Sequence, residues 1–140
     1  MNAPAGSPVV LSWSGGKDAA ATLLALRGTG VRVTALLTTF AGTRGSSGHG
    51  VPQQLIAAQA DALGLPLVSV ELPEPCSGAD YEHCVAAALS HPAVDGVTTM
   101  AFGDLFLEDH RTYRTAFLAA HGWNATFPLW RRDTSRLARE

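Results

Sequence analysis

Short apolar runs alternate with segments of helical periodicity along the chain, and this alternation constrains the fold more than any other feature. Five runs have the length and composition of strands: residues 9–12, 31–40, 66–72, 97–102 and 123–127. Four intervening segments repeat apolar residues at helical spacing: about residues 19–26, 52–63, 77–89 and 108–121. Strands and helices joined by such short connections predict an α/β fold with a parallel five-stranded sheet and helices on both faces.

Residues with special backbone preferences mark the expected helix ends. Pro52 suits the first position of the second helix. Ser77 with Asp80 has the pattern of an N-terminal cap for the third helix. Gly64 and Gly122 follow the last periodic residues of two helices, where glycine commonly ends a helix.

The composition is that of one globular domain. At 140 residues, the chain can bury roughly two-thirds of the surface of its unfolded state. The formal net charge of −2 gives no bulk attraction to nucleic acid or to an anionic membrane, so neither is expected as a partner. No apolar run approaches the ~18 residues of a membrane span, and residues 1–8 lack the parts of a signal peptide. We expect residues 1–8 to be a flexible N-terminus.

The cysteines indicate a reduced, cytoplasmic protein. Cys76 and Cys84 are too few for a disulfide scaffold, and their spacing is not that of a zinc site. Cys84 lies on the apolar face of the third predicted helix and is expected in the core. Cys76, in a predicted loop, is the better candidate for a reactive thiol.

The first strand leads into the segment Ser-Trp-Ser-Gly-Gly-Lys-Asp, residues 12–18. Such a turn is typical of an anion site, because glycines let backbone N–H groups approach a ligand and the next helix adds further N–H groups and its positive dipole end. Lys17, the only lysine in the chain, adds a mobile positive charge. The alternative is an ordinary strand-to-helix turn in which Asp18 acts only as the N-cap.

The spacing of this turn separates it from two better-known phosphate loops. No glycine lies five residues before Gly16 and no Ser or Thr follows Lys17, so it is not a Walker A loop. It also lacks the third glycine of the dinucleotide fingerprint. Ser-Gly-Gly-Lys-Asp after a first strand resembles the PP-loop of the ATP pyrophosphatase superfamily, whose members hold the β,γ-pyrophosphate of ATP and cleave at the α-phosphorus. Ala19 stands where that loop usually has Ser or Thr, so one hydroxyl contact to phosphate is absent.

A second cluster of polar residues follows the fourth predicted strand. Residues 102–111, Phe-Gly-Asp-Leu-Phe-Leu-Glu-Asp-His-Arg, contain three acids, a histidine and an arginine. Carboxylates suit Mg²⁺, a guanidinium suits phosphate, and an imidazole suits proton transfer. The alternative is that Glu108 and Asp109 only favour a helix N-terminus and that Arg111 is solvated. Ligands bind beyond the carboxyl ends of parallel strands, so this cluster, His49 and the glycine-rich turn are expected at one edge of the sheet.

Four segments together resemble the diphthine–ammonia ligase family, whose members are also described as adenine nucleotide alpha hydrolases. These are the glycine-rich turn, His-Gly-Val at 49–51, Gly-Asp-x-x-Leu-Glu-Asp-His-Arg at 103–111, and Phe-Pro-Leu-Trp at 127–130. The resemblance covers essentially all 140 residues and implies a single PP-loop ATP-binding domain with a HUP-type, Rossmann-like sheet. Longer members carry a further region with a Glu-Asn-Gly-Glu-Phe-His-type motif. This sequence has no such motif, so we expect it to be the N-terminal ATP-binding portion.

The resemblance also implies a reaction with ATP and Mg²⁺ as cofactors. A substrate carboxylate attacks the ATP α-phosphorus and releases pyrophosphate, and ammonia then displaces AMP. In archaea and eukaryotes the substrate is diphthine on elongation factor 2. The alanine-rich composition, with arginine in place of lysine, indicates a GC-rich bacterial genome, in which the carboxylate substrate is a different, unknown one. A homodimer is a compatible assembly.

Site residues follow from the same resemblance. Those implied to bind the nucleotide are Ser12, Ser14, Gly15, Gly16, Lys17, Asp18, His49, Gly103 and Asp104. Those implied to be catalytic are Lys17, Asp109, His110 and Arg111. The implied metal ligands are Asp18 and Glu108.

Two other functions are compatible with the residues. The main alternative is a nucleotide-binding module of the same fold without chemistry, which Ala19 and the missing C-terminal region favour. A tRNA-thiolating PP-loop enzyme that uses Cys76 is less favoured, because this cysteine has no Cys-x-x-Cys partner. Basic residues are also few apart from four near the end of the chain: Arg131, Arg132, Arg136 and Arg139.

Overall fold

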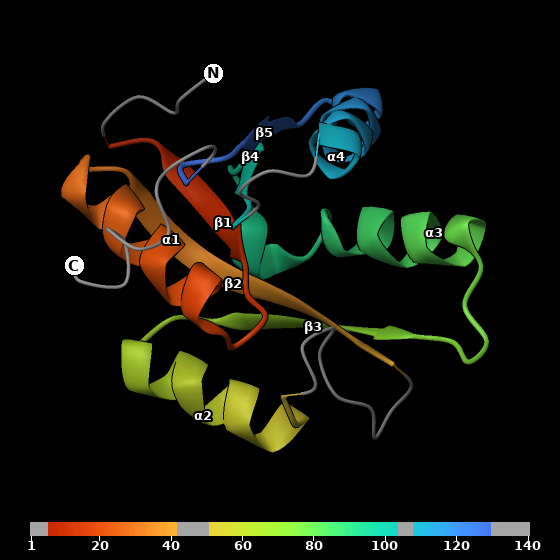
Figure 1. Ribbon diagram of the computed structural model, residues 1–140, viewed down its shortest axis with the longest axis horizontal. Coiled ribbons are helices and arrows are strands. Elements are labelled where there is room, and N and C mark those ends of the chain that lie inside the picture. The colour runs from red at the N-terminus through yellow and green to blue at the C-terminus, as the bar shows by residue number, and fades with distance from the viewer. Residues whose placement is uncertain (1–5, 42–50, 104–107, 130–140) are drawn as a thin grey trace.

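A parallel β-sheet forms the centre of the fold in the computed structural model, which describes residues 6–41, 51–103 and 108–129 (Figure 1). The strands in these ranges are β1 (Pro8–Ser12), β2 (Arg32–Ala41), β3 (Leu67–Leu72), β4 (Thr99–Ala101) and β5 (Asn124–Thr126). The helices in the same ranges are α1 (Lys17–Gly28), α2 (Gln53–Leu63), α3 (Gly78–Ala88) and α4 (Glu108–Ala120), with a short 3-10 helix, η1 (Pro92–Val94). None of the helices described is long and apolar enough to cross a membrane.

The strands lie in the order β3-β2-β1-β4-β5, and every neighbouring pair is parallel. From β1 the chain moves outward to β2 and β3, then returns past β1 to β4 and β5. The connections that follow β1 and β4 therefore leave in opposite directions from two adjacent strands. The predicted α/β class is confirmed, and the reversal of strand order lies between β1 and β4, where open parallel sheets bind their ligands.

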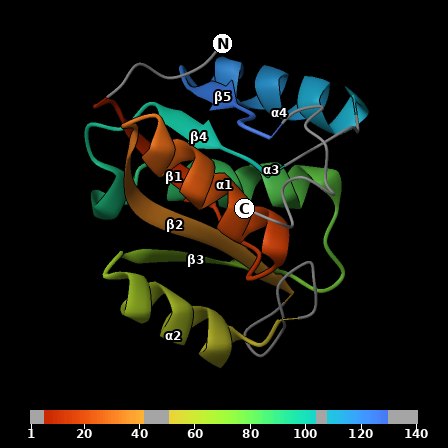
Figure 2. The same ribbon diagram turned by 60° about the vertical axis from the view of Figure 1, so that its left-hand side comes forward.

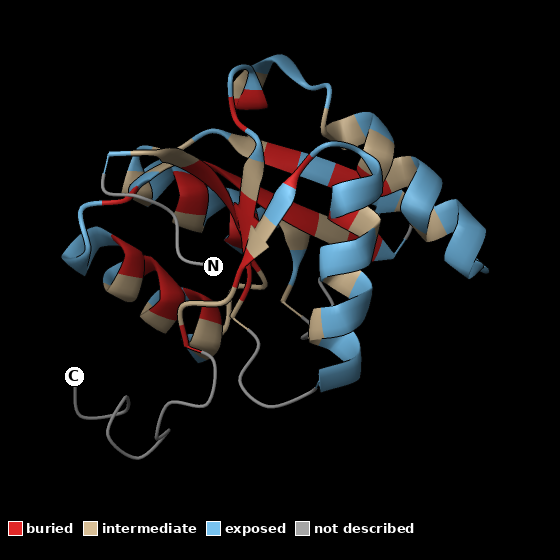
Figure 3. Cartoon of the chain, turned by 90° about the horizontal axis from the view of Figure 1, so that it is seen from above, coloured by how far each residue is buried: buried red, intermediate tan, exposed pale blue. Residues whose placement is uncertain are grey.

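Helices cover both faces of this sheet, as predicted. α1 and α2 pack on one face, and α3 and α4 pack on the other (Figures 1 and 2). Val9 and Leu11 of β1 join the α1/α2 layer, whereas Val10 joins the α3/α4 layer, because successive side chains of a strand point to opposite faces. Figure 3 shows the buried residues gathered in the sheet and on the helix faces turned toward it.

Some element bounds differ from those that the sequence predicts. β4 and β5 have three residues each and are shorter than the apolar runs 97–102 and 123–127. Val97 and Trp123 are buried in the α3/α4 layer but lie outside the strands. Apolar content thus reports burial here rather than strand pairing. Pro52 is the N-cap residue of α2 rather than its first helical residue.

The predicted cap of α3 is present. The Ser77 Oγ accepts a hydrogen bond from the Asp80 N–H at 3.0 Å, and the Asp80 carboxylate accepts one from the Ser77 N–H at 3.2 Å. Gly64 and Gly122 have φ values of +71° and +75°, the left-handed conformation in which helices commonly end. Helix boundaries are therefore set by side-chain hydrogen bonds and glycine conformation, in addition to packing.

Replacement of the capping serine is expected to weaken the fold measurably. Ser77→Ala leaves an N–H group of α3 without its side-chain acceptor and should lower the free energy of unfolding by about 1 kcal/mol in urea denaturation. Ser90→Ala is the matched control, because Ser90 is exposed and follows the end of α3. A loss in Ser77→Ala no larger than that in Ser90→Ala would contradict the role of the cap.

Candidate functional site

The segment that follows β1 turns sharply into α1. Trp13 is still held against β2, because its N–H donates to the Leu37 carbonyl at 2.8 Å. Residues 14–16 make the turn, and α1 begins at Lys17 with Gly16 as the N-cap residue. Gly16 has no side chain with which to cap this helix. The first turn of a helix leaves N–H groups without partners inside the helix, so this end of α1 can donate hydrogen bonds to a ligand.

Gly15 is the residue on which this turn depends. Its φ is +84°, a conformation that side chains with a Cβ rarely adopt. A Cβ at this position would lie 2.6 Å from the Ile56 Cδ1, and 3.1 Å from both the Gln59 Oε1 and the Val51 Cγ1. Two of these residues belong to α2, so the glycine lets the turn pack directly on that helix. The turn is shaped by α2 as well as by its own sequence.

The alternative in which Asp18 acts only as the N-cap of α1 is wrong. Gly16 holds that position, and Asp18 is the second residue of the first turn, where its charge favours the positive end of the helix dipole. Lys17 is exposed, and Ser12, Ser14 and Asp18 are partly buried. The predicted phosphate-contacting residues therefore retain access to solvent.

Ala19 is in a different environment from its neighbours in the turn. Its side chain is 3% exposed and packs in the apolar cluster between the sheet and the α1/α2 layer. A hydroxyl group on this side chain would lie in a buried position rather than on the solvent-facing side of the turn. The absence of Ser or Thr at this position is thus compatible with the local packing.

The loop that follows β4 meets the first turn of α1, as predicted for Gly103. A Cβ at Gly103 would lie 3.2 Å from the Asp18 carbonyl oxygen and 3.1 Å from the Thr22 Oγ1. Thr22 itself donates a hydrogen bond to that same carbonyl at 2.6 Å. Backbone approach this close brings the connections after β1 and β4 together at the reversal of strand order.

The acidic cluster begins α4. Glu108 and Asp109 lie in its first turn, and both are exposed, as is His110. The position of the two acids agrees with the alternative in which they favour the helix N-terminus. Arg111 is different, because it is partly buried and its guanidinium lies 5.7 Å from the centre of the Phe127 ring. Arg111 is therefore more than a solvated side chain.

A pair of stacked rings supports two arginines at the ends of β4 and β5. Phe102 and Phe127 stack with their centroids 5.5 Å apart. Arg114 lies 4.5 Å above the Phe102 ring, next to Arg111 above Phe127. Arginine over an aromatic face is held by cation–π attraction and by burial of its stem. This side of the site therefore carries two oriented positive charges, of which the sequence predicted one.

Two predicted nucleotide-binding residues, His49 and Asp104, lie outside the described residues. Within residues 6–41, 51–103 and 108–129, no group of three or more His, Cys, Asp or Glu side chains could hold a metal ion. Mg²⁺ in nucleotide sites commonly takes one or two carboxylates and completes its shell with phosphate oxygens and water. Asp18, in the first helical turn of α1, and Glu108, exposed in the first turn of α4, are compatible only with a site of that kind.

Gln59 is a residue of this site that sequence analysis missed. Its Oε1 accepts a hydrogen bond from the Trp13 indole Nε1 at 2.8 Å, and its Nε2 donates to the Gly15 carbonyl at 3.5 Å. The sequence does contain one indication of this role, because Gln59 is a polar residue at a position where the helical periodicity of α2 places apolar residues. Glutamine on an otherwise apolar helix face needs a hydrogen-bonding partner, and that partner is the phosphate-loop turn.

Comparison with protein families gives a match over residues 7–122 to the Diphthamide synthase N-terminal domain. The chain belongs to this family. The matched region contains the turn after β1, Gly103 and all of α4, and it supports the predicted PP-loop, ATP-binding class. Comparison with curated proteins finds no match.

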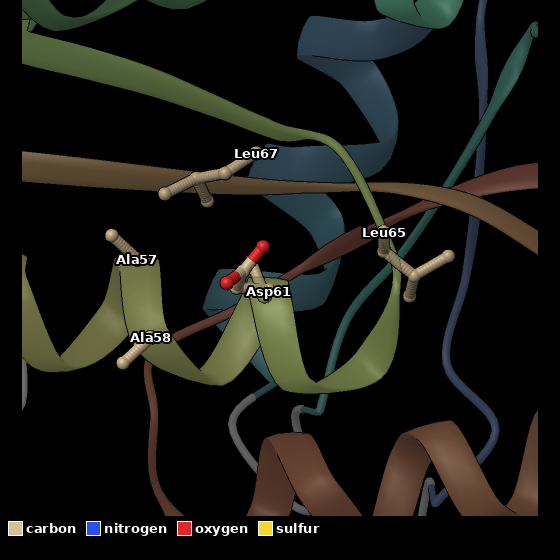
Figure 4. A pocket seen from close by; sticks show the side chains of 6 residues that line it. Ala57, Ala58, Asp61, Leu65 and Leu67 are labelled. Carbon is tan, nitrogen blue, oxygen red and sulfur yellow. The ribbon is translucent and has the colours of Figure 1, made fainter.

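A groove of about 460 Å³ lies between α2 and the start of β3 (Figure 4). It is lined by Ala57, Ala58, Ala60, Asp61, Leu65 and Leu67. These residues lie on α2, on the connection that follows it, and at the start of β3, whereas the PP-loop lies at the carboxyl end of β1. Small apolar side chains and one carboxylate do not suit a polyanion, so this groove is not the nucleotide site.

Cys76 is exposed, as predicted for the more accessible of the two cysteines. Partial desolvation raises the pKa of its thiol, and the nearby Asp80 carboxylate and Cys84 raise that pKa further. A raised pKa leaves less thiolate near neutral pH, and the thiolate is the reactive form.

Substitution of Gly15 tests the packing of the PP-loop turn on α2. Gly15→Ala would force a Cβ into a left-handed conformation and against the Cδ1 of Ile56, which is fully buried. The free energy of unfolding should fall by about 1–3 kcal/mol in urea denaturation. Gly28→Ala is the control, since no atom lies within 4 Å of a Cβ built there. Equal stabilities of the two variants would contradict the packing.

Proposed function

We propose that this chain binds ATP at the reversal between β1 and β4, with the phosphates on residues 14–18. The observation that carries the proposal is the contact of Gly103 with the first turn of α1. It joins the loop after β4 to the loop after β1, at the end of α1 where glycine is the N-cap residue. Membership in the Diphthamide synthase N-terminal domain family supports the same site.

The chemistry of the turn suits a polyphosphate. Gly15 and Gly16 allow close approach of the backbone, the first turn of α1 supplies N–H donors and the positive dipole end, and Lys17 supplies a mobile cation. Ser12 and Ser14 add hydroxyl groups on the strand side of the turn. Gly103 and Asp104 would then face the adenosine end, with His49 as a further contact.

Mg²⁺ would be held by Asp18 and Glu108 together with phosphate oxygens, and it would neutralise charge on the pyrophosphate. The donor set fits this role, because carboxylate oxygens are the protein ligands that Mg²⁺ prefers.

We propose an amide-forming reaction of the kind implied for the diphthine–ammonia ligase family. A carboxylate oxygen of the acceptor attacks the α-phosphorus, the bond from that phosphorus to the β,γ-pyrophosphate breaks, and an acyl-adenylate results. The nitrogen of ammonia then attacks the acyl carbon, AMP leaves, and a base takes the proton from nitrogen. Transfer at phosphorus needs charge neutralisation and in-line positioning more than a covalent nucleophile from the protein.

The residues of α4 would act on the acceptor side. Arg111, oriented over the Phe127 ring, would hold the acceptor carboxylate, and Arg114, over Phe102, adds a second positive charge. Asp109 and His110, exposed in the first turns of α4, would take the proton released by ammonia. The acceptor is proposed only as a carboxylate, with diphthine on elongation factor 2 as the acceptor if the source is archaeal or eukaryotic. A cytoplasmic location and a homodimer stay predictions.

A nucleotide-binding module without chemistry is the second candidate. The buried, apolar Ala19 in place of a hydroxyl residue favours it. Release of pyrophosphate distinguishes the two: a ligase converts ATP to AMP and pyrophosphate when the carboxylate and ammonia are present, whereas a binding module leaves ATP intact. The tRNA-thiolation alternative stays less favoured, because Cys76 has no Cys-x-x-Cys partner.

Isothermal titration of Mg-ATP tests the binding. The wild-type chain should bind with a dissociation constant between micromolar and millimolar, which corresponds to roughly −8 to −4 kcal/mol. Lys17→Ala should weaken the affinity by about ten- to a hundredfold, because a charged hydrogen bond to phosphate contributes about 1.5–3 kcal/mol. Arg27→Ala is the control, since Arg27 is also an exposed cation of α1 but lies in its last turn.

Two results would overturn this proposal. One is the absence of ATP binding by a folded wild-type chain. The other is equal affinity of the Lys17→Ala and Arg27→Ala variants, which would show that the end of α1 at the turn is not the phosphate site.

A further inference from the structure

We propose that Gln59 of α2 is a positioning residue that keeps the PP-loop turn in the orientation that binds phosphate. This rests on the proposed function. The two ends of its side-chain amide hold different parts of the turn: the Trp13 indole N–H donates to the Oε1 at 2.8 Å, and the Nε2 donates to the Gly15 carbonyl at 3.5 Å. α2 thereby contacts the turn on both sides of Ser14.

The Gly15 carbonyl is the group whose direction matters. A peptide unit is planar and trans, so the carbonyl of one residue and the N–H of the next point in opposite directions. When the Gly15 carbonyl is held toward α2, the Gly16 N–H must point away from α2. The long contact of the Gly16 N–H with the Ser14 Oγ, 3.4 Å, is made on that opposite side. Rotation of this peptide would instead turn a carbonyl oxygen toward the phosphates, which would repel them.

Glycine at 15 makes such rotation easy unless the carbonyl is held. Residues without a Cβ cross between positive and negative φ readily, and both residues of this peptide unit are glycines. The side chains around Gly15 exclude a Cβ, so the sequence cannot stiffen the turn by using a larger residue there. The hydrogen bond from Gln59 of α2 holds the carbonyl side of this peptide without a larger residue at position 15.

The Trp13 indole fixes which end of the Gln59 amide faces the turn. Trp13 is 6% exposed and packs in the α1/α2 layer, so its ring cannot turn away freely. The indole N–H is a donor only, and it therefore selects the Oε1 of Gln59 as its partner. The Nε2 is then left facing the Gly15 carbonyl, which is an acceptor only. The three groups form one chain of matched donors and acceptors.

The first experiment measures the indole hydrogen bond without any nucleotide. The chain has three tryptophans, and the indole N–H signal in ¹H–¹⁵N spectra that disappears in Trp13→Phe belongs to Trp13. In wild type this proton should exchange slowly with water. In Gln59→Leu it should exchange faster, whereas in Gln59→Glu it should stay protected, because the carboxylate still accepts from the indole but cannot donate to Gly15.

The second experiment measures the affinity for Mg-ATP by isothermal titration. Both Gln59→Leu and Gln59→Glu should bind about tenfold more weakly than wild type, the effect of losing a hydrogen bond of about 1 kcal/mol or more. Gln54→Leu is the matched control, because Gln54 is an exposed glutamine of the same helix. Circular dichroism and melting temperature verify that each variant is folded.

The outcomes separate this proposal from the function on which it rests. Weaker binding by Gln59→Leu, which adds no charge, together with weaker binding by Gln59→Glu with a protected indole supports a positioning role of the Gly15 arm. Wild-type affinity in Gln59→Leu and Gln59→Glu overturns the positioning role while leaving ATP binding in place. If the wild type itself binds no ATP, the proposed function is overturned and the positioning role with it.

Discussion

The pairing of β1 on both of its edges is the constraint on which the site depends. β1 is parallel to β2 on one side and to β4 on the other, and its residues Val9, Val10 and Leu11 are fully buried between two helical layers. A strand held on both edges and both faces has one position in the sheet. Its carboxyl end, and with it the glycine-rich turn, is therefore fixed next to the end of β4. The position of the site is therefore set by the strand order, and individual side chains act within that frame.

Two close backbone approaches then shape that edge, and both use glycine. Gly15 lets the turn pack on α2, and Gly103 lets the loop after β4 touch the first turn of α1. The first contact orients the turn, and the second closes the gap between two loops that leave the sheet in opposite directions. Side-chain amide and hydroxyl groups complete these contacts, through Gln59 on the Gly15 carbonyl and Thr22 on the Asp18 carbonyl.

Sequence patterns predicted the fold well, because periodicity and glycine or proline positions report local structure directly. The alternation of elements, the helices on both faces and the Ser77 cap are confirmed. The alternative in which Asp18 only caps α1 is excluded, because Gly16 takes the N-cap position. Gln59 and Arg114 were missed because each acts on a residue distant in the sequence, Trp13 and Phe102, and a single sequence does not show which residues meet across elements.

Backbone ¹H–¹⁵N spectra recorded during titration with Mg-ATP test whether the loops after β1 and β4 form one nucleotide site. Amide signals of residues 14–18 and of Gly103 should shift together, with one saturation curve. Signals of the groove between α2 and β3, such as those of Ala58 and Leu67, should stay in place. Shifts confined to that groove, or shifts of the β1 loop without Gly103, would show that the two loops do not form one site.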